Sequence, residues 1–214
     1  TILGGAGDDC ISGGVGVGLV GDGNDSILGG DGDDTLIGDF GNDTISAGNG
    51  NDFLQGDVGD DALFGESGND LLLGSIGDDI INGGIGDDSL GGGIGNDTLI
   101  GDVGNDFFEG NIGNDYFQLN SPGSGVDFIN DFTTGVDVIL LSTTDFGGAL
   151  TVGVLNPNQF VVGVAASNSF PQLIYDNGSA NLFFDADGIG PVLQVQIATL
   201  AAAPSLSASD ILII

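Results

Sequence analysis

The sequence contains no basic side chains. Its 214 residues include no Lys, Arg or His but 32 Asp and Glu, which gives a formal net charge of −32. Soluble domains normally carry charges of both signs on about a quarter of their residues. Without cationic side chains to meet a phosphate, nucleic acids and anionic membrane surfaces are disfavoured as partners. The carboxylates need a counter-charge from outside the chain, and a bound divalent cation supplies it most simply.

The missing residue types also argue against catalysis. Without His or Lys the usual general bases are absent, and a Ser/His or Cys/His pair cannot form. A single cysteine, Cys10, allows no internal disulfide and no tetrahedral zinc site. We interpret Cys10 as a bystander thiol on an outward strand position, with intermolecular pairing as the alternative. We therefore expect no enzyme here, and any catalytic activity of the protein to lie upstream of Thr1.

Long apolar runs are absent as well. No stretch of 18 or more consecutive apolar residues marks a membrane span. The chain has no signal peptide and opens at Thr1 inside a repeat, so we expect it to be a piece of something longer.

Acidic chains with few aromatic residues, here 7%, are often disordered. Two features argue against disorder: 40% of the residues are hydrophobic, and the mean hydropathy is +0.28. The 43 glycines make the unfolded chain very entropic, so folding needs strong compensation. The composition therefore indicates a folded chain that depends on a ligand.

A nine-residue period fills the first half of the chain. Residues 20–118 hold eleven contiguous copies of the pattern G-x-x-G-[DN]-D-x-U-x, in which U is a large apolar residue. Another complete copy lies at 4–12, and 13–19 form a degenerate copy without the aspartate. A flexible Gly/Asp-rich spacer is the alternative, but a spacer would not need an apolar eighth position in every contiguous copy.

Each complete copy has an aspartate at its sixth position. These aspartates are Asp9, Asp25, Asp34, Asp43, Asp52, Asp61, Asp70, Asp79, Asp88, Asp97, Asp106 and Asp115.

This pattern resembles the RTX, or hemolysin-type, calcium-binding repeat. The resemblance implies an all-β fold, a parallel β-roll (a β-solenoid) with 18 residues per coil. The glycines allow tight turns, and the last three residues of each repeat form a short strand whose central side chain points inward. Two repeats make one coil, so the resemblance brings Asp25 near Asp43 and Asp34 near Asp52.

The resemblance also implies the calcium ligands. Two sixth-position aspartates in successive coils, with carbonyl oxygens from both turns, offer the six or more oxygens that Ca²⁺ takes. Eleven contiguous copies give nine such pairs, so we expect about nine ions or more, which would bring the charge to roughly −14. The fourth-position glycines expected to contribute are Gly23, Gly32, Gly41, Gly50, Gly59, Gly68, Gly77, Gly86, Gly95, Gly104 and Gly113.

After the roll (1–118) we expect a capping segment at 119–142 and a β-rich, secretion-type domain at 143–214. The cap matches a closing motif common in RTX proteins, D-x-I-x-D-F-x-x-G-x-D-x-I-x-L. A solenoid needs an end that covers its last core layer. The aspartates expected to extend metal binding into the cap are Asp127, Asp131 and Asp137.

Three features mark residues 143–214. The runs LIYD and NLFFD around Asn177 and Gly178 predict a β-hairpin. The chain ends with Asp210 before an apolar tail, which resembles the uncleaved C-terminal address of RTX proteins exported by type I secretion. The segment 185–188 resembles the start of an EF-hand loop, but Gln196 replaces the glutamate of its twelfth position, so we interpret it as a structural turn.

Together these features predict a bacterial protein, secreted or at the cell surface. We expect it to stay unfolded in a calcium-poor cytosol, leave through a type I exporter and fold on calcium outside. A structural role in a matrix, surface layer or filament is favoured; the alternative is a folding and secretion module of a larger enzyme, toxin or adhesin. An adhesin stalk or an ice- or ligand-binding surface would need a flat array of Thr, and only Thr35, Thr44 and Thr98 are scattered along the repeats.

Apolar residues at positions expected to face outward favour the structural role, because exposed apolar surface marks interfaces. We therefore expect self-association through this surface. The residues are Phe53, Phe64, Leu71, Leu73, Ile80, Phe107 and Tyr116 on the strands and Phe40, Val58, Ile76, Ile85, Ile94, Val103 and Ile112 on the rims.

Overall fold

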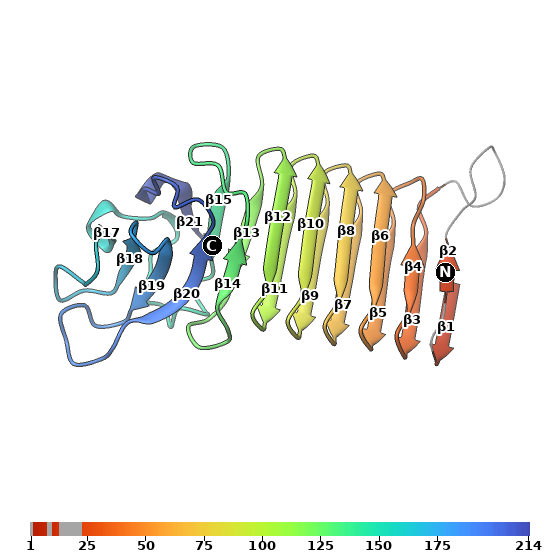
Figure 1. Cartoon of the computed structure of the whole chain (residues 1–214), viewed down its shortest axis with the longest axis horizontal. Coiled ribbons are helices and arrows are strands. Elements are labelled where there is room, and N and C mark those ends of the chain that lie inside the picture. Colours follow the sequence, from red (N-terminus) through yellow and green to blue (C-terminus); the bar gives the residue numbers. More distant parts are fainter. Residues whose placement is uncertain (1, 8–9, 13–22) are drawn as a thin grey trace.

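A computed structural model describes residues 2–7, 10–12 and 23–214 of the chain. Asp9 and the degenerate copy at 13–19 therefore lie outside the described residues. The described part consists of two sheets and two short 3-10 helices, η1 (Pro157–Gln159) and η2 (Ala208–Asp210). Figure 1 shows the strands stacked one behind another along the long axis, with a β-rich cap at the C-terminal end.

Strands alternate between the two sheets along the repeats. In spatial order, the first sheet consists of β1 (Ile2–Ala6), β3 (Ser26–Asp31), β5 (Thr44–Asn49), β7 (Ala62–Ser67), β9 (Ile80–Ile85), β11 (Thr98–Val103), β13 (Tyr116–Leu119), β15 (Val138–Leu141), β21 (Ile211–Ile213) and β16 (Gly153–Val154). The second consists of β17 (Phe160–Val162), β18 (Gln172–Asp176), β19 (Asn181–Asp185), β20 (Val195–Leu200), β14 (Asp127–Ile129), β12 (Phe107–Ile112), β10 (Ser89–Ile94), β8 (Leu71–Ile76), β6 (Phe53–Val58), β4 (Thr35–Ile37) and β2 (Cys10–Ser12).

Each coil contains 18 residues. Strands one coil apart pair in parallel, so that Leu54 lies beside Leu72 in the second sheet and Ile45 lies beside Leu63 in the first. The predicted parallel β-roll is confirmed.

The strands are longer than the sequence suggested. From β5 to β12 each strand has six residues, running from the seventh position of one repeat to the third position of the next. The expected three-residue strands are wrong, because pairing continues through the second and third positions: Asp57 pairs with Ser75, and Val58 with Ile76. The second position has a positive φ (72° at Asp57, 85° at Ser75), which bends the strand without ending the ladder.

The core is a single file of apolar side chains from the eighth positions. These side chains are at most 1% exposed, as predicted, and Phe108 and Phe117 occupy the last regular coil. Among the described residues of the eleven contiguous copies, the first position also faces inward and is glycine or, once, Ala47. The interior is therefore thin, and each coil buries its apolar residues only against its neighbours.

The cap continues both sheets of the roll. β14 and β15 pair with the last repeat strands, and β20 and β21 then add one more parallel strand to each sheet. Residues near the C-terminus, Ile211 and Ile213, thus belong to the final coil and are buried. The predicted hairpin forms as β18 and β19 around Asn177 and Gly178. The proposed boundaries at 118 and 142 fall inside this continuous stack.

Candidate metal sites along the two edges of the roll

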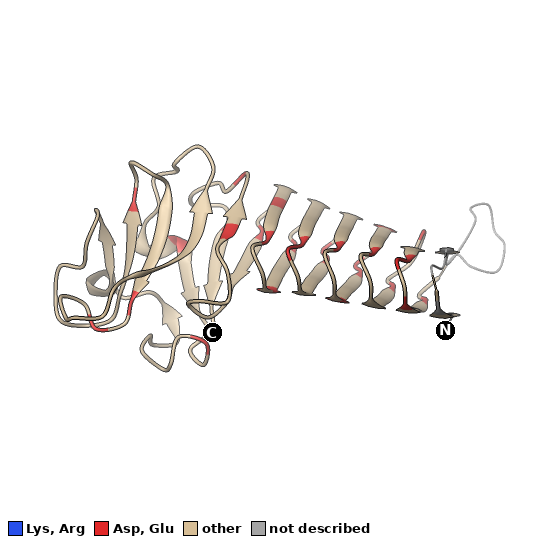
Figure 2. Ribbon diagram, turned by 60° about the horizontal axis from the view of Figure 1, so that its bottom comes forward, with Lys and Arg blue, Asp and Glu red and all other residues tan. Residues whose placement is uncertain are grey.

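The sixth-position aspartates form two ladders, one at each edge of the roll. In every regular coil the Oδ1 of one aspartate accepts a hydrogen bond from the backbone N–H of the aspartate one coil earlier, over 2.6–2.9 Å. One ladder contains Asp25, Asp43, Asp61, Asp79, Asp97 and Asp115, and the other Asp34, Asp52, Asp70, Asp88 and Asp106. Figure 2 shows acidic positions recurring at the turns from coil to coil.

In eight of these carboxylates the second oxygen is buried and has no hydrogen-bond partner. This holds for Oδ2 of Asp43, Asp52, Asp61, Asp70, Asp79, Asp88, Asp97 and Asp106. A buried carboxylate oxygen without a partner is costly when charged, since nothing replaces the water it has lost. Burial raises the pKa of Asp70 and Asp79 to about 7 and that of Asp61, Asp88 and Asp97 to about 6, with neighbouring carboxylates adding to the shift. A positive charge close to these oxygens would therefore stabilise the ionised carboxylates.

Glycines at the first position keep the space beside these oxygens open. A Cβ on Gly74 would collide with Oδ2 of Asp79 and would stand 2.8 Å from the carbonyl oxygen of Gly92 in the next coil. The same arrangement recurs at Gly38 and Gly65. Carboxylate and carbonyl oxygens around a space without a side chain are the donors that a hard cation such as Ca²⁺ prefers.

The fourth-position glycines stack against one another. Gly77 has a φ of 145°, and a Cβ there would collide with the carbonyl oxygen of Gly59, one coil earlier. Each carbonyl from Gly23 to Gly104 likewise faces the glycine of the following turn, and Gly113 ends the regular series against the carbonyl of Gly95. The predicted carbonyl donors therefore lie between successive turns.

Two of the three predicted cap aspartates extend the ladders. Oδ1 of Asp127 accepts from the N–H of Asp106, and Oδ1 of Asp137 from that of Asp115, both over 3.1 Å. Burial raises the pKa of Asp127 to about 8. Asp131 lies elsewhere: its two oxygens accept from the N–H groups of Gly110 and Asn111.

An outer ladder at the fifth position went unnoticed in the sequence reading. The Oδ1 of Asp78 accepts from the N–H of Asn96 over 2.7 Å, and that of Asp87 from the N–H of Asn105 over 2.8 Å. Here the residue in the earlier coil accepts the hydrogen bond, whereas in the two sixth-position ladders the residue in the later coil accepts it. The strict Asn-or-Asp choice at this position was the available signal, since both side chains offer the required oxygen. The outer ladder fixes the stacking of exposed turns.

Two further observations concern metal binding outside the ladders. Within the described ranges, no three His, Cys, Asp or Glu side chains converge, so a metal would need two carboxylates plus carbonyl oxygens. The segment 185–188 forms a turn in which Asp187 donates its N–H to Asp185 and Gly188 has a φ of 68°.

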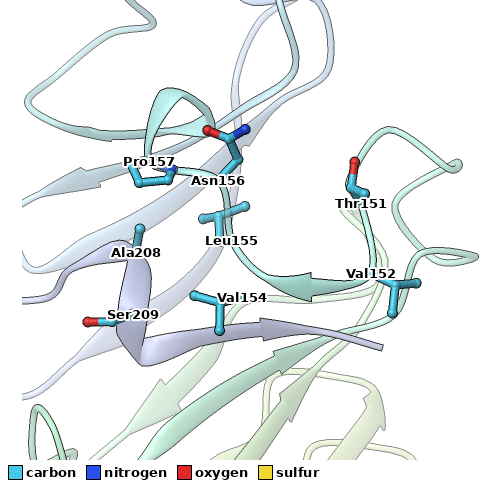
Figure 3. A pocket seen from close by; sticks show the side chains of 8 residues that line it. All are labelled: Thr151, Val152, Val154, Leu155, Asn156, Pro157, Ala208 and Ser209. Atoms are coloured by element: carbon cyan, nitrogen blue, oxygen red, sulfur yellow. The ribbon is translucent and has the colours of Figure 1, made fainter.

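A cavity of about 540 Å³ lies in the cap between residues 151–157 and η2. Figure 3 shows its lining, which contains no ionisable side chain: Thr151, Val152, Val154, Leu155, Asn156, Pro157, Ala208 and Ser209. It supplies no acid or base for catalysis.

The fold and the two ladders define a class, the calcium-binding β-rolls. The chain belongs to the RTX calcium-binding nonapeptide repeat family, whose sequence profile matches it four times, over 1–20, 19–54, 55–90 and 91–120. Repeats of this family bind calcium.

Comparison with solved structures finds similarity to the AlgE6R3 subunit of the Azotobacter vinelandii mannuronan C5-epimerase. The two chains are 22% identical over 92% of this chain and 82% of that one, with a TM-score of 0.29. No curated protein matches the chain. Among the residues that the structure describes, no helix is long and apolar enough to cross a membrane.

Proposed function

We propose that this chain is a secreted roll that folds when it meets calcium outside the cell. The buried Oδ2 atoms carry the proposal. In a calcium-poor cytosol, folding would bury these charges without compensation and would also order a glycine-rich backbone, so the chain stays unfolded. Outside, cations between successive turns neutralise the carboxylates, and the binding free energy becomes folding free energy.

The proposed ligands are the ladder aspartates and the carbonyl groups of the fourth-position glycines. The ladders, extended by Asp137 and Asp127, have seven and six members and therefore leave six and five gaps. Nine gaps lie among the regular repeats, so we propose about nine ions, or about eleven with the cap. Asp9 would extend this set, whereas Asp131 is held by backbone N–H groups outside the ladders.

Type I export is part of the proposal. It is supported by the resemblance of the C-terminal segment, with Asp210 before its apolar tail, to the address of exported RTX proteins. An unfolded, highly acidic chain suits passage through a narrow exporter, and folding outside opposes its return.

For the secreted roll, extracellular or at the cell surface, we propose a structural role in a matrix, surface layer or filament. Support comes from apolar side chains that recur on the outside, such as Ile76 (49% exposed) and Ile112 (66% exposed). The alternative is the folding and secretion module of a larger enzyme, toxin or adhesin. The resemblance of the C-terminal segment to a secretion address supports this alternative as much as it supports the structural role.

Circular dichroism and sedimentation of the full chain, with calcium titrated from excess chelator to several millimolar, test the proposal. We expect a cooperative coil-to-β transition driven by calcium, because no single repeat buries a core alone. Polymers larger than a dimer favour the structural role, and a monomer or a dimer favours the module. Folded β-structure that persists in excess chelator at about pH 8 would contradict calcium-gated folding.

A further inference from the structure

One edge of the roll carries an unbroken column of exposed apolar side chains. Val58, Ile76, Ile94 and Ile112 are the last residues of β6, β8, β10 and β12, at the arrowheads in Figure 1. Phe40 pairs with Val58 and extends the column by one coil. We call these five residues the apolar edge column. Neighbours are in parallel register, so at about 4.8 Å per coil the column is about 19 Å long.

The opposite edge differs at the same repeat position. There the third-position residues begin with Asp31, Asn49 and Ser67, and only Ile85 and Val103 are apolar. The third position of the repeat therefore does not require an apolar residue. The apolar edge column is a property of one edge, 39–66% exposed along its whole length.

We propose that the apolar edge column is the contact between two copies of this chain, packed antiparallel about a two-fold axis near Ile76. This inference rests on the proposed calcium-driven folding, since only the folded roll aligns the five residues. The two-fold axis would place Phe40 against Ile112, Val58 against Ile94, and Ile76 against its own mate.

The period of the column favours a second copy as the partner. A second roll presents the same spacing of about 4.8 Å, so all five side chains find partners in one register. A surface without this period would match only one or two of them. The five side chains of the column themselves carry no ionisable group.

The exposed area is of the size that a dimer needs. If a large apolar side chain offers roughly 200 Å², the column presents roughly 500 Å² per copy. Two copies would then bury up to about 1,000 Å², about the area at which a contact qualifies as a biological interface.

Charge makes the association conditional. Two chains with a formal charge of −32 repel each other, and bound calcium and dissolved salt both reduce this repulsion. The dimer should therefore tighten as ionic strength rises, whereas association with a cationic partner would weaken.

Sedimentation velocity of the full chain in several millimolar calcium tests the inference. We expect a dimer for the unchanged chain and for the control pair Ile85→Ser with Val103→Ser, which changes the same repeat position on the opposite edge. The pair Ile76→Ser with Ile94→Ser should raise the dimer Kd by at least about a hundredfold, because four apolar side chains per dimer lose their contacts.

Circular dichroism of the same samples separates the possible failures. A chain that folds with calcium but stays monomeric, or in which both pairs weaken association equally, contradicts the edge contact and leaves calcium-gated folding intact. A chain that does not respond to calcium contradicts the proposed function itself. In a Cys10→Ser background, Ile76→Cys should cross-link two copies on oxidation and Ile85→Cys should not; the reverse result also contradicts the edge contact.

Discussion

The backbone N–H of Asp61 donates to Oδ1 of Asp79, one coil further along, over 2.8 Å. The N–H of Asp79 in turn donates to Oδ1 of Asp97 over 2.9 Å. Both carboxylates thus use one oxygen for coil-to-coil registry, and their Oδ2 atoms have no hydrogen-bond partner. Each also borders two gaps, one on each side.

Replacing Asp79 by Asn separates registry from the proposed calcium binding. Asn can still accept the N–H of Asp61, but it removes the charge and puts an amide where Oδ2 stood. We expect Asp79→Asn to lower the calcium stoichiometry by about two ions and to raise the calcium concentration needed for folding. Equilibrium dialysis with radioactive calcium measures both. The neighbouring Asp78→Asn is the control, because Asp78 is exposed and accepts from Asn96; equal losses in both variants would refute the assignment.

The raised pKa values predict an unusual pH dependence without calcium. Asp70 and Asp79 have a pKa of about 7 in the roll, against an ordinary value of 3.8, so the folded state holds protons that the unfolded chain has released. Their contribution to stability is present below about pH 4 and is lost as the pH rises through 7. In chelator, circular dichroism should therefore detect more β-structure at about pH 5 than at about pH 8, where the chain stays unfolded.

With saturating calcium the order should reverse, because protons and calcium compete for the same oxygens. A chelated chain with more β-structure at the alkaline pH would show that the buried carboxylates are not protonated in the roll.

Gly77 should not tolerate a side chain. It combines a φ of 145° with a close approach to the carbonyl group of Gly59, so Gly77→Ala should cost about 3 kcal/mol or more of unfolding free energy. Gly91→Ala is the matched control, because its Cβ would meet only the flexible end of Leu73, at 3.0 Å. Urea unfolding in calcium should show a change of about 1 kcal/mol or less for this control. Similar losses would argue against tight turn stacking.

Asp210 connects the C-terminal segment to the cap. Its Oδ1 accepts from Gly135 and its Oδ2 from the N–H and hydroxyl of Ser207. Asp210→Ala should lower the unfolding free energy by about 1.5–3 kcal/mol, since three hydrogen bonds to a charged acceptor are lost. Ser209→Ala, which changes an exposed hydroxyl beside it, should have little effect in the same thermal or urea measurement. An unaffected Asp210→Ala would mean that the last coil contributes little.

Strict periodicity explains what could be predicted. The apolar eighth position and the aspartate at the sixth, as in Leu72 and Asp70, specify an 18-residue coil, a buried file and two ladders. The length of the strands was not predicted, because Gly and Asp at the first three positions are typical of turns. Residues such as Asp57 nevertheless remain paired in the sheet despite a positive φ.

The cap was harder to predict because its pairings have no period. Ile211 joins the roll beside Ile139, across more than seventy intervening residues, and no local pattern specifies that pairing. Asp127, Asp131 and Asp137 look equivalent in the sequence. Only the path of the chain decides that Asp127 and Asp137 align with the ladders while Asp131 caps the N–H groups of Gly110 and Asn111.

Anomalous scattering from crystals grown in calcium tests the central claim most directly. Calcium-driven folding predicts peaks between carboxylates of successive coils, such as Asp61 and Asp79, repeated along both edges of the roll. A folded roll in calcium with no peaks in these gaps, or with ions only on the exposed fifth-position residues, would contradict it.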